Sequence, residues 1–183
     1  MAFDSTISGP NTTSYVSVSD ADSYFLLQLD GPTFWSTLPT ATKQAALTQA
    51  TNRLDAELYS GRPTTDEQRL QWPRSFVVSR NQYPSQDIVA FIGGQYYIDS
   101  HIIPKELADA TCEQALHYLK INAGEFTVDE NDLETLKTYK LGPIDVTIKD
   151  NVKADRIPSK VKSLLKAIGM DAWLGEQPIT MVR

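Results

Sequence analysis

Apolar positions recur with helical spacing between residues 40 and 60 of the chain. One stripe in this region comprises Leu47, Ala50, Thr51, Leu54 and Leu58. A stripe with this spacing predicts an amphipathic helix whose apolar side packs against other elements. Gly61 and Pro63 follow it, and we expect them to end the helix because both residue types interrupt helical backbone.

A second, short helix is predicted directly after this stop. Thr64 and Glu67 have the spacing of a capping box, in which two side chains satisfy each other's backbone N–H groups. Trp72-Pro73 is expected to end this helix, since a proline ring moves the preceding residue out of the α region. The indole of Trp72 would then stand at a fixed bend.

Three more helices are predicted elsewhere in the chain. The first of these helices has Ser19 as its predicted N-cap. The apolar residues of this helix are Ala21, Tyr24, Phe25, Leu26, Leu27 and Leu29. Trp35, in the link after the helix, is expected in the core. The longest helix begins at Pro104, ends near Gly124 and has an apolar face wide enough to contact two or more helices. The last helix is expected over residues 157–169.

Extended structure is predicted in two places. Residues 88–92 and 95–98 are apolar or aromatic runs separated by Gly93-Gly94, which is typical of a β-hairpin. We expect this hairpin to be an insertion over about residues 76–100. Residues 140–149 form a further strand, in which Ile144, Val146 and Ile148 alternate with polar residues. Pro143 favours a sheet edge or a free strand there, because proline cannot donate to a ladder.

Together these patterns predict a mainly α fold: a small helical bundle with an inserted β-hairpin and extended N- and C-terminal arms. Residues 1–14 are polar, lack apolar periodicity and are expected to be a flexible arm. Residues 15–169 would form one helical domain. Residues 170–183 are too apolar for a terminus that makes no contacts, and they are too short to form a core of their own. We therefore expect them to be a docking tail.

Composition narrows the possible partners and compartments. Seventeen Lys and Arg residues face 23 Asp and Glu residues, giving a net charge of −6. This balance opposes general attraction to nucleic acid, which depends on surplus cations, but it leaves room for a local basic groove. The single cysteine, Cys112, has no internal disulfide partner, and no signal-peptide pattern opens the sequence. No apolar run approaches the roughly 18 residues that span a bilayer. We expect a soluble chain that folds in a reducing cytoplasm.

The sequence carries no recognisable catalytic motif. It lacks a G-x-S-x-G elbow, a P-loop, a dinucleotide fingerprint and an H-E-x-x-H motif. His101 and His117 are too far apart to suggest a pair of ligands, and Asp20 with Asp22 is better explained by helix N-terminal electrostatics. We therefore expect no enzyme, no metal site and no cofactor, although catalytic groups could still converge in space.

One aromatic and basic cluster fits single-stranded nucleic acid, where bases stack on aromatic rings beside cations. Its members are Trp72, Arg74, Phe76, Arg80 and Tyr83. The favoured interpretation is structural: a turn held by a buried Trp72, with Arg74 paired to a carboxylate. The lysines between residues 153 and 166 form a second basic stretch. They are more often the solvated face of a helix, though they could meet an acidic partner or DNA.

Several short motifs occur in a characteristic order. They are Y-V-S-x-x-D-A-D-x-Y from Tyr15, A-T-x-x-L-D from Ala50, Q-x-L-x-W-P-R from Gln68, I-P-x-x-L-x-x-A from Ile103 and K-x-G-P from Lys140. This order resembles a family of tailed-bacteriophage head-to-tail connector, or adaptor, proteins over roughly residues 15–148. Some members of that family are named after a primosomal single-stranded-DNA-binding protein.

The resemblance implies a structural role in the virion. The chain would assemble in the host cytoplasm as a homo-oligomeric ring, a dodecamer in this family, that docks on the phage portal protein. The ring would extend the DNA channel and receive the next tail component. The resemblance also implies an alternative, binding of single-stranded DNA through Trp72, Arg74 and Arg80. The residues expected to contact the portal or a neighbouring subunit are Ile144, Val146, Ile148, Trp173, Leu174, Ile179, Met181, Val182 and Arg183.

Overall fold

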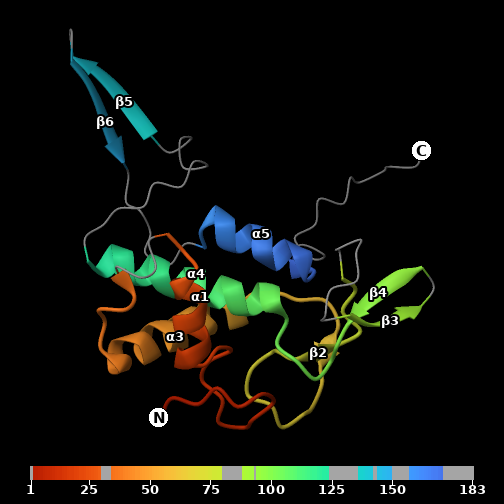
Figure 1. Ribbon diagram of the computed structural model, residues 1–183. Coiled ribbons are helices and arrows are strands. Elements are labelled where there is room, and N and C mark those ends of the chain that lie inside the picture. Colours follow the sequence, from red (N-terminus) through yellow and green to blue (C-terminus); the bar gives the residue numbers. More distant parts are fainter. Residues whose placement is uncertain are drawn as a thin grey trace, which may run out of the picture.

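The computed structural model describes residues 2–29, 34–79, 88–92, 94–123, 136–141, 144–149 and 157–170. Helices make up most of its regular structure (Figure 1). They are α1 (Val18–Leu26), α3 (Thr40–Asp55), α4 (Lys105–Asn122) and α5 (Ser159–Ala167). Three antiparallel strand pairs accompany them: β1 (Arg62–Pro63) with β2 (Arg74–Ser75), β3 (Ile88–Ile92) with β4 (Gln95–Ile98), and β5 (Leu136–Leu141) with β6 (Ile144–Lys149). The predicted mainly α fold with a β-hairpin is confirmed.

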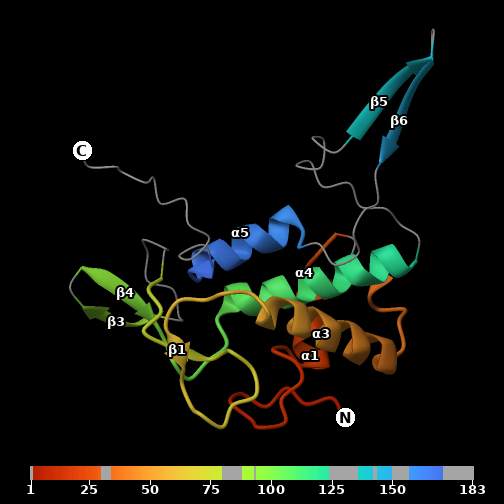
Figure 2. The same cartoon turned by 180° about the vertical axis from the view of Figure 1, so that it is seen from behind.

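Helix α4 is the centre of the bundle. It packs against α1, α3 and α5, and both views place α3 and α5 on opposite sides of it (Figures 1 and 2). Small and medium-sized side chains make this possible, because they let neighbouring helices approach closely. The buried residues of α4 are Leu107, Ala110, Thr111, Cys112, Gln114 and Ala115. The wide apolar face expected from the sequence is thus used by several partners.

Glu113 of α4 connects three helices through one carboxylate oxygen. The Tyr24 hydroxyl of α1 donates to its Oε1 at 2.6 Å, and Nζ of Lys160 in α5 lies 2.6 Å from the same atom. The Glu113 side chain is only 12% exposed. Burial and the neighbouring Glu113 carboxylate raise the pKa of Tyr24, so the hydroxyl remains a donor.

The first helix begins earlier than predicted. Ser17, not Ser19, is its N-cap, because the Ser17 hydroxyl accepts a hydrogen bond from the Asp20 backbone N–H at 3.1 Å. Only Ala21 and Phe25 of this helix are buried. The predicted apolar side is therefore wrong at its C-terminal end. Three leucines at the end of the helix and just after it are exposed: Leu26 (72%), Leu27 (87%) and Leu29 (101%).

The short helix predicted after residue 63 is absent from the described segment 64–73, so that prediction is wrong. Gln68 Oε1 accepts hydrogen bonds from the backbone N–H groups of Thr64 and Thr65, at 3.0 and 3.1 Å. The Thr64 hydroxyl donates instead to the carbonyl of Ser100, at 2.7 Å. The backbone N–H and the hydroxyl of Thr64, which a capping box would use, are thus bonded to Gln68 and Ser100 instead. Leu58, predicted on the α3 stripe, is 59% exposed because α3 ends at Asp55.

The polar N-terminal segment is folded against the body over residues 2–14, which differs from the expected mobile arm. The Asp4 carbonyl accepts hydrogen bonds from the N–H groups of Thr13 and Ser14, at 2.7 and 3.0 Å. The Gly9 carbonyl accepts another from the N–H of Arg69, at 3.2 Å. Ser14 is fully buried. Hydrogen bonds, which leave no apolar period in a sequence, order this segment.

The predicted hairpin of β3 and β4 is present, with Phe91 opposite Tyr96. Residues 140–149 divide between two strands: Lys140 belongs to β5, and β6 begins at Ile144 and pairs with β5 along its whole length. Ile144, Val146 and Ile148 therefore lie in a strand with one described neighbour, which agrees with the predicted sheet edge rather than with the alternative of a free strand. Gly169 has a φ of 86° just beyond α5, which agrees with its expected role as the stop of the last helix. The predicted docking residues Trp173, Leu174, Ile179, Met181, Val182 and Arg183 lie outside the described residues.

Replacing Glu113 by alanine should lower the free energy of unfolding by about 2 kcal/mol, because the partly buried Tyr24 hydroxyl loses its acceptor and Lys160 loses its ion pair. Urea denaturation measures this loss. The matched control is Glu67→Ala, which removes an exposed carboxylate and should change stability by less than about 0.5 kcal/mol. Equal stabilities of the two variants would contradict the role assigned to Glu113.

Candidate functional sites

Trp72 is a core residue rather than a surface platform. Only 1% of it is exposed. Its ring packs edge-on against Tyr59, with the ring centroids 5.6 Å apart. The indole Nε1 is buried and has no hydrogen-bond partner among the described residues. A base cannot stack on a ring that the protein itself encloses, so Trp72 is not a nucleic-acid contact in this fold.

Arg74 is 6% exposed and closes the turn that follows α3. Its Nε donates to the carbonyl of Ser60 at 2.8 Å, and one terminal nitrogen donates to the carbonyls of Tyr59 (3.3 Å) and Gly61 (2.8 Å). The other terminal nitrogen donates to Gln71 Oε1 at 2.7 Å. The expected carboxylate partner is replaced by backbone carbonyls, because this turn leaves several acceptors buried that require donors.

The chain around Arg74 is fixed from several directions. The N–H of Gln71 donates to Asp55 Oδ1 at 2.7 Å, and the Tyr15 hydroxyl donates to the same carboxylate oxygen. Burial, followed by the Asp55 charge, raises the pKa of Tyr15. Gly61 has a φ of 73°, and a Cβ there would lie 2.2 Å from the Ser75 carbonyl. Only glycine allows β1 and β2 to approach this closely.

The remaining members of the predicted nucleic-acid cluster are divided. Arg80 and Tyr83 lie outside the described residues. Phe76 is 65% exposed, and the Arg62 guanidinium carbon lies 5.1 Å from the centre of its ring. Arg62 was not among the sequence candidates. In the sequence, Arg62 is distinguished only by preceding Pro63. In the structure, Arg62 is the antiparallel partner of Ser75, and this pairing places Arg62 next to Phe76.

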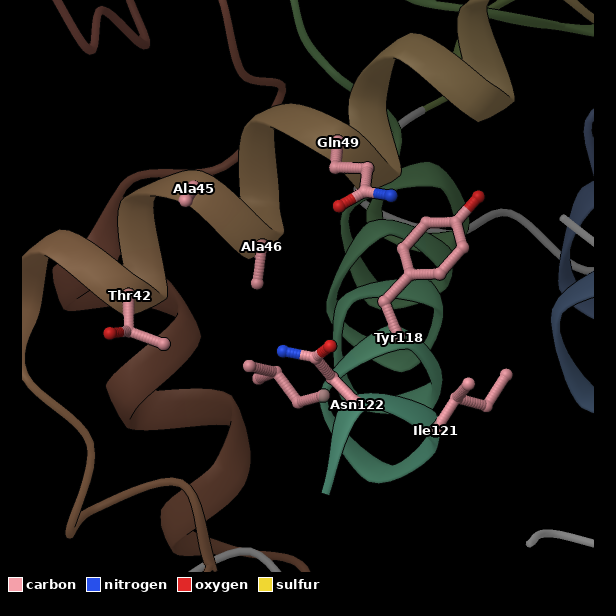
Figure 3. Close-up of a pocket in the computed structure, with 8 residues that line it drawn as sticks. Thr42, Ala45, Ala46, Gln49, Tyr118, Ile121 and Asn122 are labelled. Atoms are coloured by element: carbon pink, nitrogen blue, oxygen red, sulfur yellow. The ribbon is translucent and has the colours of Figure 1, made fainter. Parts of the chain in front are cut away.

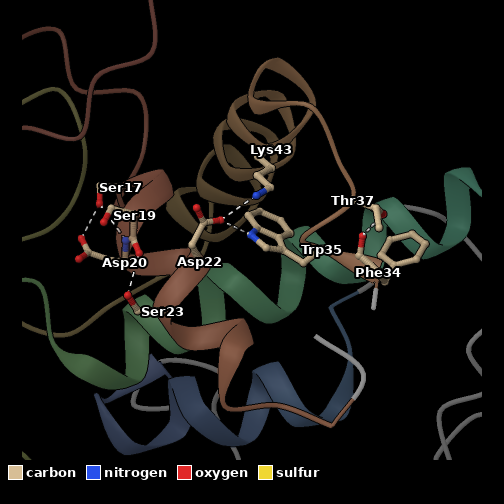
Figure 4. A network of polar contacts seen from close by, with 9 residues as sticks. All are labelled: Ser17, Ser19, Asp20, Asp22, Ser23, Phe34, Trp35, Thr37 and Lys43. Atoms are coloured by element: carbon tan, nitrogen blue, oxygen red, sulfur yellow. Dashed lines mark hydrogen bonds and ion pairs between the residues drawn. The ribbon is translucent and has the colours of Figure 1, made fainter. Parts of the chain in front are cut away.

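A second polar cluster joins α1 and α3 around Trp35 (Figure 4). Trp35 is 1% exposed, as predicted for a core residue. Its Nε1 donates to Asp22 Oδ1 at 2.7 Å, and Lys43 Nζ lies 2.9 Å from that oxygen. Burial alone would raise the pKa of Asp22, but the hydrogen bonds from Lys43 and Trp35 outweigh it and lower this pKa. The cluster fixes Trp35 and leaves the Asp22 side chain half exposed.

Several surface hollows lie among the described residues. One adjoins the Trp35 cluster and is lined partly by Asp22, Leu26 and Lys43. Another lies between α3 and the N-terminal segment and is lined partly by Phe3, Gln49 and Arg69. A third lies between α3 and the C-terminal half of α4 (Figure 3). Its lining consists of Thr42, Ala45, Ala46, Gln49, Tyr118, Leu119, Ile121 and Asn122. Tyr118 is the single titratable side chain in that lining, so this hollow offers no pair of acid and base groups.

The described part of the chain has neither a cluster of metal-ligand side chains nor a membrane-spanning helix. No group of three or more His, Cys, Asp and Glu residues there is arranged to hold a metal ion. No helix within the same residues is long and apolar enough to cross a membrane. Cys112 is buried, and burial raises the pKa of its thiol well above its usual range, so it is a poor nucleophile.

Arg74→Lys should lower the free energy of unfolding by about 2–4 kcal/mol, because a lysine cannot replace the several donors that Arg74 directs at buried carbonyls. Urea denaturation is the measurement. Arg62→Lys is the matched control and should stay within about 0.5 kcal/mol of the unsubstituted protein, since Arg62 is exposed. If Arg74→Lys left stability unchanged and abolished binding to single-stranded DNA, the structural role assigned to Arg74 would be wrong.

Comparison with known proteins assigns the chain to one protein family. The chain has no significant match among curated proteins or among solved structures. A family model described as "Putative DnaT-like ssDNA binding protein" matches residues 1–183, which is the whole chain. The chain therefore belongs to this DnaT-like family.

Proposed function

We propose that this protein is a structural adaptor that joins the head and the tail of a tailed phage. The observation that carries the proposal is the exposed leucine cluster at the end of α1, formed by Leu26, Leu27 and Leu29. Three neighbouring leucines in water are costly, and such apolar patches mark protein contact surfaces. A subunit of a ring requires contacts of this kind.

Two further observations support a protein-binding role. Trp72 and Arg74, the strongest candidates for stacking and phosphate contacts, are used inside the fold. The chain also has a net charge of −6, which works against strong binding of a phosphate backbone. The order of short motifs from Tyr15 to Pro143 adds the resemblance to head-to-tail connectors.

In this proposal the protein is a non-enzymatic component of the virion, assembled in the host cytoplasm and located at the head-tail junction. Copies form a ring, a dodecamer by the family resemblance, on the portal protein. The ring extends the channel through which DNA passes and presents a surface to the next tail component. The C-terminal tail, from Trp173 to Arg183, is proposed to contact the portal.

The second candidate function is binding of single-stranded DNA, and the description of the family favours it. Phe76 and Arg62 form an exposed aromatic and cation pair within the described residues. A base could stack on the open side of Phe76 while a phosphate meets Arg62, which is the usual arrangement on a single-strand platform. In this alternative, the Phe76 and Arg62 pair takes the role first expected for Trp72 and Arg74.

Light scattering of the purified protein, alone and with purified portal rings, distinguishes the two functions. The adaptor proposal expects the protein to join portal as a ring of defined stoichiometry, because binding shifts assembly by mass action. A protein that ignores portal and retards a single-stranded oligonucleotide at physiological salt would overturn it. Arg62→Ala and Phe76→Ala would then test the second candidate.

Leu27→Ser should weaken association with portal or between subunits by at least about tenfold, since burying one leucine is worth about 1.5–3 kcal/mol. Leu27 is 87% exposed, so the free energy of unfolding should change by less than about 0.5 kcal/mol. Leu58→Ser is the matched control, because Leu58 is an exposed leucine outside the cluster. Equal association of both variants would show that the cluster is not an interface.

A further inference from the structure

The hairpin of β5 and β6 has two edges without a partner strand in the part of the chain that the structure describes. Its ladder is regular, from Leu136 opposite Lys149 to Leu141 opposite Ile144. No third described strand joins this sheet. Each outer edge therefore carries backbone N–H and C=O groups that no described strand satisfies. A two-stranded hairpin alone is only marginally stable in water, so a further paired strand would stabilise it.

The register sorts the hairpin positions into two unlike faces, because residues directly opposite each other share a face and successive residues alternate. One face is mainly apolar and contains the positions Lys137, Tyr139, Leu141, Ile144, Val146 and Ile148. The other is mainly polar and contains the positions Leu136, Thr138, Lys140, Asp145, Thr147 and Lys149. Any strand that extends this sheet must repeat the same alternation, or apolar and polar positions would meet.

Strand β5 of a second copy meets this requirement at the outer edge of β6. Inside one chain, β5 already matches β6 in length, alternation and charge, since Lys140 lies opposite Asp145. The same register between copies would place Lys140 of the next copy on the other side of Asp145. Opposite charges across strands are favourable, and like charges there are not. The hairpin also stands away from the four helices in both views (Figures 1 and 2).

We propose that the β5–β6 hairpins of neighbouring copies join edge to edge, with β6 of one copy paired to β5 of the next. This inference rests on the proposed ring. Pairing of this kind is head-to-tail, so repeating it around a ring gives one closed antiparallel sheet with an even number of strands. Closure removes every free edge and stabilises hairpins that are marginal alone.

Mixing two single-cysteine proteins tests the pairing. Thr138 and Thr147 occupy opposite positions of the ladder, where Cβ atoms lie about 4.5–5.5 Å apart, close to disulfide distance. Thr138→Cys protein is mixed with Thr147→Cys protein, at high concentration and also on portal rings, and oxidised. Neither chain can form an internal hairpin disulfide, and the native Cys112 is buried. Thr65→Cys, at an exposed loop position, gives the background from random collisions.

The proposal expects covalent dimers in the mixture at least about tenfold above the Thr65→Cys background, because strand pairing raises the local thiol concentration to about the millimolar range. Each hairpin variant oxidised alone should stay near background. Dimers from Thr138→Cys alone or from Thr147→Cys alone would mean like-with-like pairing and would overturn the proposal, as would background levels in the mixture.

The same samples separate this inference from the proposed function. If portal rings bind the protein with normal stoichiometry and the mixture does not crosslink, hairpin pairing is wrong and the adaptor function stands. If portal binds nothing while the mixture crosslinks in free solution, the hairpins pair and the adaptor function is wrong. Crosslinking of a hairpin cysteine to portal alone would assign the edge to portal and overturn pairing between copies.

Discussion

The fold depends on the burial of α4 by three other helices. Its packing face contains small and medium-sized side chains such as Ala110, Cys112 and Ala115, which allow α3 and α5 to lie close on either side. Glu113, at the margin of this face, adds one carboxylate shared by α1 and α5. Apolar burial supplies the stability of the bundle, and the shared carboxylate fixes how the outer helices are positioned.

In the turn after α3, backbone carbonyls that need hydrogen-bond donors determine the role of the Arg74 side chain. The carbonyls of residues 59–61 are left without helical partners once α3 ends at Asp55. Arg74 satisfies them and is buried in doing so, and Trp72 fills the space beside Tyr59. Trp72 and Arg74, which resemble part of a nucleic-acid site in the sequence, are therefore buried in the interior of the fold. Phe76 and Arg62 remain at the surface.

The surfaces that remain for function are of different chemistry. Exposed leucines lie at the end of α1, and an aromatic and cation pair lies beside β2. The β5–β6 hairpin has strand edges that no other described strand joins. The first and third suit association with protein, because they offer apolar area and backbone hydrogen-bonding groups. Membership of the DnaT-like family is compatible with the second, and the two functions need different surfaces of one subunit.

Apolar periodicity determined the helices around Leu47, Leu107 and Val161, because their packing faces repeat along the chain. The turn signal between two apolar runs determined the hairpin at Gly94. Local context, rather than periodicity, favoured an interior position for Trp35 and Trp72 over a surface role. Only the tertiary structure decided the cap at Ser17, the loss of the short helix after Pro63, the folded residues 2–14 and the carbonyl partners of Arg74. Each of these depends on hydrogen bonds between residues distant in sequence or on competition among nearby polar groups, and neither leaves a repeating pattern.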